Sequence, residues 1–229
     1  MSKFLTGPSI LVKMRHVKKW LVVLLLLSSA LLIAIFLDQP ISLWFDQPER
    51  NGLRLFSLAI TDIGKSEQWF ALSILILILG KAILLIRPQS LYIDKIKNLM
   101  AWAAHLFIAL IVSGLILHLI KMSVGRERPH ISPTRDPFVF HPGTVNWDFE
   151  SFPSGHTQTL FCVAFLFVLL WPKKNWLFWT LAALLSYTRV TALQHFTSDI
   201  IGGAIIGVLG SQLSIWFFSK KIQMPRPLD

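Results

Sequence analysis

Apolar residues occur along the chain in six long runs separated by shorter polar stretches. The runs cover residues 20–37, 69–86, 100–120, 157–171, 176–187 and 200–218. A helix that crosses the hydrocarbon core of a bilayer needs about 20 apolar residues, so most of these runs are long enough or nearly so. The pattern predicts an all-α polytopic membrane protein, a six-transmembrane-helix bundle that forms a single domain over residues 1–229.

The composition supports a membrane protein. Hydrophobic residues make up 54% of the sequence and charged residues 15%, which is too apolar for an ordinary soluble domain. Basic residues precede the first run, as they do in a signal peptide. That run is long for a signal peptide, however, and no small-residue cleavage pattern follows it, so we expect a retained span. Cys162 is the sole cysteine in the sequence, which excludes an intrachain disulfide.

The net charge of +10 is explained by topology. With a cytoplasmic N-terminus, the inner segments hold 13 basic and two acidic residues, whereas the outer segments hold 8 basic and 10 acidic residues. This bias follows the positive-inside rule, so nucleic-acid binding is not needed to explain the charge. It predicts cytoplasmic N- and C-termini and a periplasmic outer face. A bacterial inner membrane fits the short loops, with the endoplasmic reticulum as the alternative.

The outer segment 38–68 is long and has its own apolar spacing. Leu53, Phe56 and Ile60 follow an i, i+3, i+7 pattern. This spacing predicts a short helix that lies on the membrane surface. A packed cover over the outer loops is an equally good interpretation of the same residues.

Three polar stretches fall at the outer ends of the runs, where the topology brings them to one face. They contain Lys121, Arg128, Ser154, Gly155, His156, Arg189, His195 and Asp199. Three cations beside two histidines suit a multiply charged anion, because lysine supplies a point charge and arginine a planar fork that matches phosphate oxygens. Ser154 and Gly155 begin a predicted helix, where free backbone N–H groups attract an anion.

The two histidines suit phosphoryl transfer. His195 and Asp199 are four residues apart and would share one face of a helix. The carboxylate can accept the hydrogen of one ring nitrogen and leave the other nitrogen free as a nucleophile. His156 is then the second proton-transfer group. Together these residues predict an enzyme that forms a phosphohistidine.

These residues also match a known signature. Lys121, Arg128 and Pro129 form K-x6-R-P, residues 153–156 form P-S-G-H, and Arg189, His195 and Asp199 form R-x5-H-x3-D. The chain resembles the type 2 phosphatidic acid phosphatase superfamily, a family of membrane lipid phosphate phosphatases. Thr188 stands where that family usually has serine, and it keeps the hydroxyl.

The resemblance implies a role for each matching residue. His195 is the nucleophile, His156 the general acid and Asp199 the residue that orients His195. The residues expected to hold the phosphate are Lys121, Arg128, Ser154, Gly155 and Arg189. The family needs no metal and no cofactor, so we expect a metal-independent hydrolase of phosphoric esters or anhydrides.

Other interpretations use the same residues. Taken singly, Lys121 and Arg128 suit lipid-headgroup anchors, and His195 with Asp199 suits a structural hydrogen bond. A phosphatase for a soluble phosphate ester is the alternative enzyme, and a lipid or phosphate transporter or flippase is the alternative of another class. Transporters usually place their polar residues near the membrane midplane rather than at one face.

The expected partners are a phosphorylated lipid and the bilayer, with no nucleic acid and no obligate protein partner. The lipid stays open among phosphatidic acid, phosphatidylglycerol phosphate, undecaprenyl diphosphate and lipid A. His130 and His141 lie in the outer loop but lack the spacing of metal ligands, so no metal site is predicted there.

Overall fold

The computed structural model describes residues 8–87 and 91–228, with side chains from residue 21 onward, and this part of the chain is mostly helical. The α-helices are α1 (Pro8–Phe36), α2 (Asp38–Phe45), α3 (Asn51–Ile60), α4 (Ser66–Ile86), α5 (Ile93–Val124), α6 (Gly155–Leu170), α7 (Asn175–Thr191) and α8 (Thr197–Phe218). Within the described residues, the sole β feature is an isolated bridge between Arg126 and Phe140. The predicted all-α class is confirmed. The two chain ends, whose side of the membrane the charge pattern predicts, lie outside the described residues.

Each of the six apolar runs lies in a helix, but the helices differ in length. By length and composition, three stretches of the described chain suffice to cross a membrane: Pro48–Ile86, α5 and α8. A fourth arises if α1 and α2, which meet at a bend of 58°, form one broken span. With 16 and 17 residues, α6 and α7 are shorter. The described residues therefore contain three or four helical stretches able to span a membrane, and crossing by all six runs stays a prediction.

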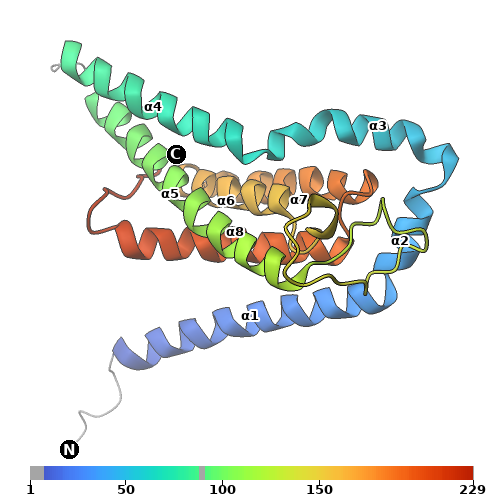
Figure 1. Ribbon diagram of the computed structural model, residues 1–229. Coiled ribbons are helices and arrows are strands. Elements are labelled where there is room, and N and C mark those ends of the chain that lie inside the picture. The colour runs from blue at the N-terminus through green and yellow to red at the C-terminus, as the bar shows by residue number, and fades with distance from the viewer. Residues whose placement is uncertain (1–7, 88–90, 229) are drawn as a thin grey trace, which may run out of the picture.

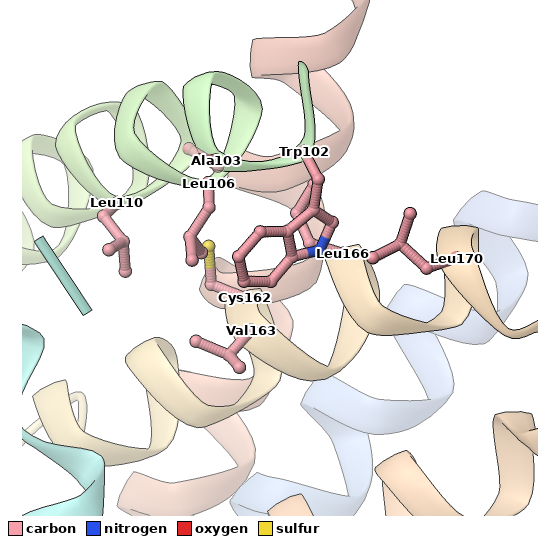
Figure 2. Packing of buried hydrophobic residues seen from close by; sticks show 9 residues of the cluster. Trp102, Ala103, Leu106, Leu110, Cys162, Val163, Leu166 and Leu170 are labelled. Atoms are coloured by element: carbon pink, nitrogen blue, oxygen red, sulfur yellow. The ribbon is translucent and has the colours of Figure 1, made fainter. Parts of the chain in front are cut away.

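The centre of the bundle consists of α5, α6 and α8 (Figure 1). α4 packs along α5, and α7 packs along α6. An apolar cluster joins α5 to α6, and Figure 2 shows its side chains interdigitating. The apolar cluster consists of Trp102, Ala103, Leu106, Ala109, Leu110, Cys162, Val163, Leu166 and Leu170.

Two glycines let α8 lie directly against the backbone of α6. A Cβ atom on Gly203 would lie 2.4 Å from the Ser154 carbonyl oxygen, and one on Gly207 would lie 2.4 Å from the Gln158 carbonyl oxygen. No side chain larger than hydrogen fits at either position. This close approach places the first turn of α8 beside the first residues of α6.

The outer segment 38–68 forms a helical cover that includes the short 3₁₀ helix η2 (Thr61–Gly64). A hydrogen bond of 2.6 Å between Ser57 and Thr191 ties α3 to α7. Leu53 and Phe56 are exposed, whereas Ile60 is half-buried. The predicted helix exists, and its polar side contacts the bundle while its apolar side faces outward. Whether that side lies on a membrane surface stays a prediction.

Candidate active site

The C-terminal end of α5 delivers the first cation. Lys121 lies in the last turn of α5, is buried, and donates a hydrogen bond to the Glu150 carbonyl oxygen. Gly125 then ends the helix with a φ of 60°, and a Cβ at this position would lie 1.9 Å from the His141 carbonyl oxygen. The left-handed conformation and the close approach both require glycine here. The turn directs the following residues back over the end of the bundle.

Arg128 follows that turn and is fixed from several sides. Its Nε donates to the Trp147 carbonyl oxygen at 2.7 Å, and its Nη1 donates to the Gln194 carbonyl oxygen at 3.2 Å. The guanidinium also lies 3.9 Å from the centroid of the Trp147 ring. Burial, followed by the nearby positive charge of Arg189, lowers the pKa of Arg128 to about 10, so the side chain is still charged at neutral pH. Arg128 is thus a rigid cation beside the backbone of the residue that precedes His195.

His195 lies in the turn between α7 and α8 and is buried. Its Nδ1 lies 2.7 Å from the Ser151 carbonyl oxygen and 3.6 Å from Asp199 Oδ2. A carbonyl oxygen only accepts, so Nδ1 carries the hydrogen and Nε2 keeps its lone pair. We expected Asp199 to accept this hydrogen from a shared helix face. Instead His195 precedes α8, Asp199 occupies the first turn of α8, and the Ser151 carbonyl oxygen is the closer acceptor.

Burial dominates the electrostatics of His195. It lowers the pKa of the imidazole well below its usual range, and the neighbouring cations Arg128, Arg189 and Lys121 lower it further. The Asp199 carboxylate opposes this shift. The ring is therefore neutral at physiological pH, which is the form in which Nε2 can act as a nucleophile.

The start of α6 holds the P-S-G-H residues. Ser154 precedes the helix, and its Oγ accepts a hydrogen bond from Thr157 Oγ1 at 3.1 Å. Its backbone N–H donates to the Asp199 carbonyl oxygen at 3.0 Å, which joins the starts of α6 and α8. The predicted helix start is confirmed. Gly155, the first residue of α6, lies one residue beyond this junction.

His156 faces the η2 segment. A Cβ on Gly64 would lie 3.0 Å from His156 Cδ2, so η2 packs closely on the imidazole. Within the part of the chain that the structure describes, His156 Nε2 is buried without a hydrogen-bond partner. Arg189 and Arg128 act electrostatically on this ring. A ring nitrogen with unused hydrogen-bonding capacity near two cations is available to a bound anion.

Arg189 completes the group of cations. Its Nη1 donates to Thr61 Oγ1 at 3.1 Å, while its buried Nε has no partner among the described residues. Its carbonyl oxygen accepts from the His195 N–H at 3.2 Å. Thr188, the departure from the family pattern, donates its hydroxyl hydrogen to the Leu185 carbonyl oxygen within its own helix.

The structure thus connects the residues that the sequence singled out. Lys121 and Arg128 both donate to the Glu150 carbonyl oxygen, Arg189 contacts the backbone of His195, and Ser154 contacts the backbone of Asp199. His156 joins this group through its chain neighbours and through the charges around it. Among the residues that the structure describes, no group of three or more acidic, histidine or cysteine side chains could hold a metal ion.

Comparison with known proteins identifies this arrangement. The family model described as the PAP2 superfamily matches residues 102–223, which covers the site from α5 through α8. This chain belongs to the PAP2 superfamily.

Similar proteins support the assignment. A lipid A 1-phosphatase of Rhizobium etli is 33% identical over 167 residues, which cover 70% of this chain and 69% of the relative. An undecaprenyl-diphosphatase of Sulfolobus acidocaldarius is 27% identical over 180 residues, which cover 76% of this chain and 75% of the relative. The crystal structure of a transmembrane PAP2-type phosphatidylglycerolphosphate phosphatase from Bacillus subtilis superimposes with a TM-score of 0.56 at 23% identity, covering 90% and 97% of the two chains. This last likeness shows that the PAP2 fold is shared.

Sequence reasoning missed a set of buried polar residues behind the PAP2 signature. Arg126 pairs with Asp199 Oδ1 at 2.5 Å and with Asp38 Oδ2 at 2.9 Å, and both carboxylates are fully buried. We call Asp38, Arg126 and Asp199 the buried ion chain. Ser151 donates its hydroxyl hydrogen to Asp199 Oδ2 at 2.6 Å. The only local signal was the position of Arg126, inside the K-x6-R spacing.

Proposed function

We propose that this PAP2 chain is an integral-membrane lipid phosphatase that hydrolyses a phosphate monoester or diphosphate of a lipid headgroup through a phosphohistidine on His195. The observation that carries the proposal is the orientation of the imidazole. Because Nδ1 is held by the Ser151 carbonyl oxygen, Nε2 is left unprotonated within reach of the charges of Lys121, Arg128 and Arg189. A neutral nucleophile surrounded by cations suits attack on a phosphate dianion.

The first half-reaction forms the intermediate. Nε2 of His195 bonds to phosphorus while the bond between phosphorus and the lipid oxygen breaks, and His156 gives a proton to that oxygen. The negative charge of the bound phosphate favours the protonated imidazole of His156 in the complex. In the second half-reaction a water molecule gives its proton to His156 and attacks phosphorus. The P–N bond breaks, inorganic phosphate leaves, and both histidines return to their starting states.

The surrounding groups stabilise charge rather than form bonds. Arg128 and Arg189 supply planar N–H donors, and Lys121 supplies a compact positive charge. Gly155 begins α6, where free backbone N–H groups favour an anion, and Ser154 caps this start while its own N–H donates to the Asp199 carbonyl oxygen. Electrostatic stabilisation of this kind needs no metal ion or cofactor, and we propose a metal-independent reaction.

We further propose that all six apolar helices cross the membrane as one domain, with the site at the outer, periplasmic face of a bacterial inner membrane. The charge bias of the loops supports this orientation. α6 has 16 residues and is therefore about 24 Å long, which is shorter than the roughly 30 Å hydrocarbon core. A short α6 that ends at the inner surface would therefore begin, at Gly155, below the outer headgroup level. A recessed site of this kind suits the phosphate of a lipid that stays in its leaflet.

Cysteine labelling tests the orientation. Val145 in the outer loop is 76% exposed, and Leu91 before α5 is 99% exposed. In a Cys162→Ser background, Val145→Cys should react with an impermeant thiol reagent in intact cells, whereas Leu91→Cys should react only after permeabilisation. The reverse pattern would place the site on the cytoplasmic side.

Phosphate release by the purified protein tests the activity. The panel should include lipid A, phosphatidylglycerol phosphate and undecaprenyl diphosphate, because the names of the similar proteins refer to these three lipids. Phosphatidic acid completes the panel. We expect turnover of at least one lipid and little turnover of its water-soluble headgroup. Equal activity on the soluble headgroup would favour the soluble-ester alternative, and no release from any phosphate compound would contradict a phosphatase.

A further inference from the structure

Arg126 differs from the other arginines of the site in how its side chain is used. It is 4% exposed, and each of its three guanidinium nitrogens donates to a protein oxygen. Nε donates to the Pro137 carbonyl oxygen at 2.8 Å, Nη1 to Ser198 Oγ at 2.8 Å and to Asp199, and Nη2 to Asp38. The guanidinium also lies 4.3 Å from the centroid of the Phe196 ring. An arginine engaged in this way is not directed at a substrate phosphate.

Asp38 pairs with Arg126 through a different guanidinium nitrogen from the one that contacts Asp199. Its Oδ1 accepts the Ser198 N–H at 3.0 Å, and its Oδ2 accepts from Arg126 and from the Ser198 hydroxyl. It lies at the start of α2, after the bend that follows α1. Because a buried carboxylate is costly unless it is paired, the position of Asp38 depends on Arg126.

The charges of the buried ion chain do not cancel. Two carboxyl groups share one guanidinium, so the group carries a net charge of about −1 when both are ionised. Among the described residues, the titratable ring that it contacts is His195. Without Asp38, Arg126 would neutralise Asp199 more completely. Asp38 therefore leaves part of the Asp199 charge available to the imidazole.

We infer that Asp38 and Arg126 are positioning residues that act through Asp199, and that the net charge of the buried ion chain sets how readily His195 becomes positively charged. The inference rests on the proposed role of His195 as nucleophile. When Nε2 bonds to phosphorus while Nδ1 keeps its hydrogen, the ring becomes formally cationic. A net negative charge behind Nδ1 stabilises that state and the transition state that leads to it.

The remaining charges around His195 stay constant when the buried ion chain is changed. The groups that act on the ring are Lys121 on α5, Arg128 in the 125–153 loop and Arg189 on α7. Glu150 in the same loop acts on Lys121 and Arg128, and His156 on α6 is acted on by Arg128 and Arg189. Asp199 on α8 is the only member of the buried ion chain in direct contact with His195. Changes at Asp38 or Arg126 therefore reach the imidazole through Asp199.

Variants that remove a charge and keep a polar side chain test the inference. Asp38→Asn keeps hydrogen-bonding atoms but removes one negative charge, so the acid limb of the kcat/KM pH profile should move to lower pH, by about one unit. Arg126→Gln should move it to higher pH. The double variant Asp38→Asn/Arg126→Gln restores the net charge of −1, and its limb should return toward that of the unchanged protein.

Asp46→Asn is the matched control. Asp46 lies just beyond α2 and pairs with Arg135 at 2.6 Å, outside the buried ion chain. This variant loses an ion pair from the same outer segment, and its acid limb should not move. Thermal unfolding of each purified variant shows whether it is folded. If Asp38→Asn does not fold, Arg126→Gln carries the same test with the opposite sign.

The outcomes separate this inference from the proposed function. A lower kcat in Asp38→Asn and Arg126→Gln with an unmoved acid limb would show a purely structural role and overturn the inference. Shifts of the same sign in both variants would also overturn it. If the unchanged protein releases no phosphate, or if His195→Ala retains full activity, the proposed function itself fails.

Discussion

The two ends of α5 and α6 carry opposite chemistry. The helices run antiparallel and pack together along their length (Figure 1). At one end Trp102 and Leu166 meet in the apolar cluster, which contains no charged side chain (Figure 2). At the other end Lys121 and Ser154 lie among buried ions and histidines. A single pair of helices thus combines a dry packed end with a polar reactive end.

The difference shows how stability and reactivity are divided. In the apolar cluster, the shape and volume of the side chains determine their contribution to the free energy of unfolding. Substitutions that preserve volume are therefore tolerated. In the polar end, each buried charge depends on named partners, and removal of one partner leaves another unpaired. Substitutions at the two ends should therefore affect different measurements.

The largest expected effect follows loss of the nucleophile. His195→Ala should reduce kcat/KM by about 10⁴-fold or more on lipid monophosphates and diphosphates alike, because neither can form the intermediate. Phosphate release under single-turnover conditions measures this effect. His118→Ala, which changes an exposed histidine on α5, should remain fully active. Substantial turnover by His195→Ala would show that the nucleophile lies elsewhere.

The next effect depends on the leaving group. His156→Ala should reduce kcat/KM by about 10² to 10⁴-fold on a lipid monophosphate, because an alkoxide leaving group needs a proton. A phosphate that leaves from a diphosphate has a second pKa of about 6 and needs much less help, so the loss on a matched lipid diphosphate should be smaller. Parallel kinetics on the two substrates measure the difference. Equal losses would contradict the role of His156 as general acid.

A cavity in the apolar cluster should affect stability and leave the chemistry intact. Leu166 is fully buried, so Leu166→Ala should lower the free energy of unfolding by about 2–5 kcal/mol. Unfolding in detergent measures this change, and kcat per folded molecule should stay the same. Leu115→Ala, at a side chain 63% exposed on α5, should change stability by no more than about 0.5 kcal/mol. A loss of kcat in folded Leu166→Ala would mean that the two ends are coupled.

The smallest expected effect is that of metal removal. EDTA should leave phosphate release unchanged, because cationic side chains rather than a metal stabilise the phosphate in the proposed mechanism. Vanadate, a phosphate mimic, should inhibit in the same buffer and show that the assay responds. Loss of activity with EDTA and recovery with Mg²⁺ would contradict the metal-independent mechanism.

Hydrophobic periodicity predicted where the helices lie but underestimated their length. The run at 100–120 became α5, Ile93–Val124, because the polar residues at both of its ends continue the helix. The run at 176–187 became α7, Asn175–Thr191, because Thr188 to Thr191 are buried against neighbouring elements. A prediction based on apolar residues ends the element at the first polar residues. A helix continues beyond them as long as its backbone hydrogen bonds continue.

The candidate site was predictable where residue type and spacing carry the chemistry. The contacts of His195 were not, because the Ser151 carbonyl oxygen is a backbone group that any residue would supply. Arg126 lies inside the K-x6-R spacing, but this position does not show that its side chain is buried between two carboxylates. Asp38 follows an apolar run and resembled an interfacial residue, and its partner Ser198 lies 160 positions away.

The distance between Asp38 and Ser198 has a consequence for biosynthesis. At translation rates of about 5–20 residues per second, the 160 intervening positions delay the second residue by about 8–32 s. Until Arg126 is made, the Asp38 carboxyl group lacks both partners, and until Ser198 is made it lacks one of them. During that interval it must stay hydrated or protonated. The C-terminal end of α1 and the start of α2 are therefore fixed only after the start of α8 has been made. Assembly of the reactive end is complete only after the first turn of α8 has left the ribosome.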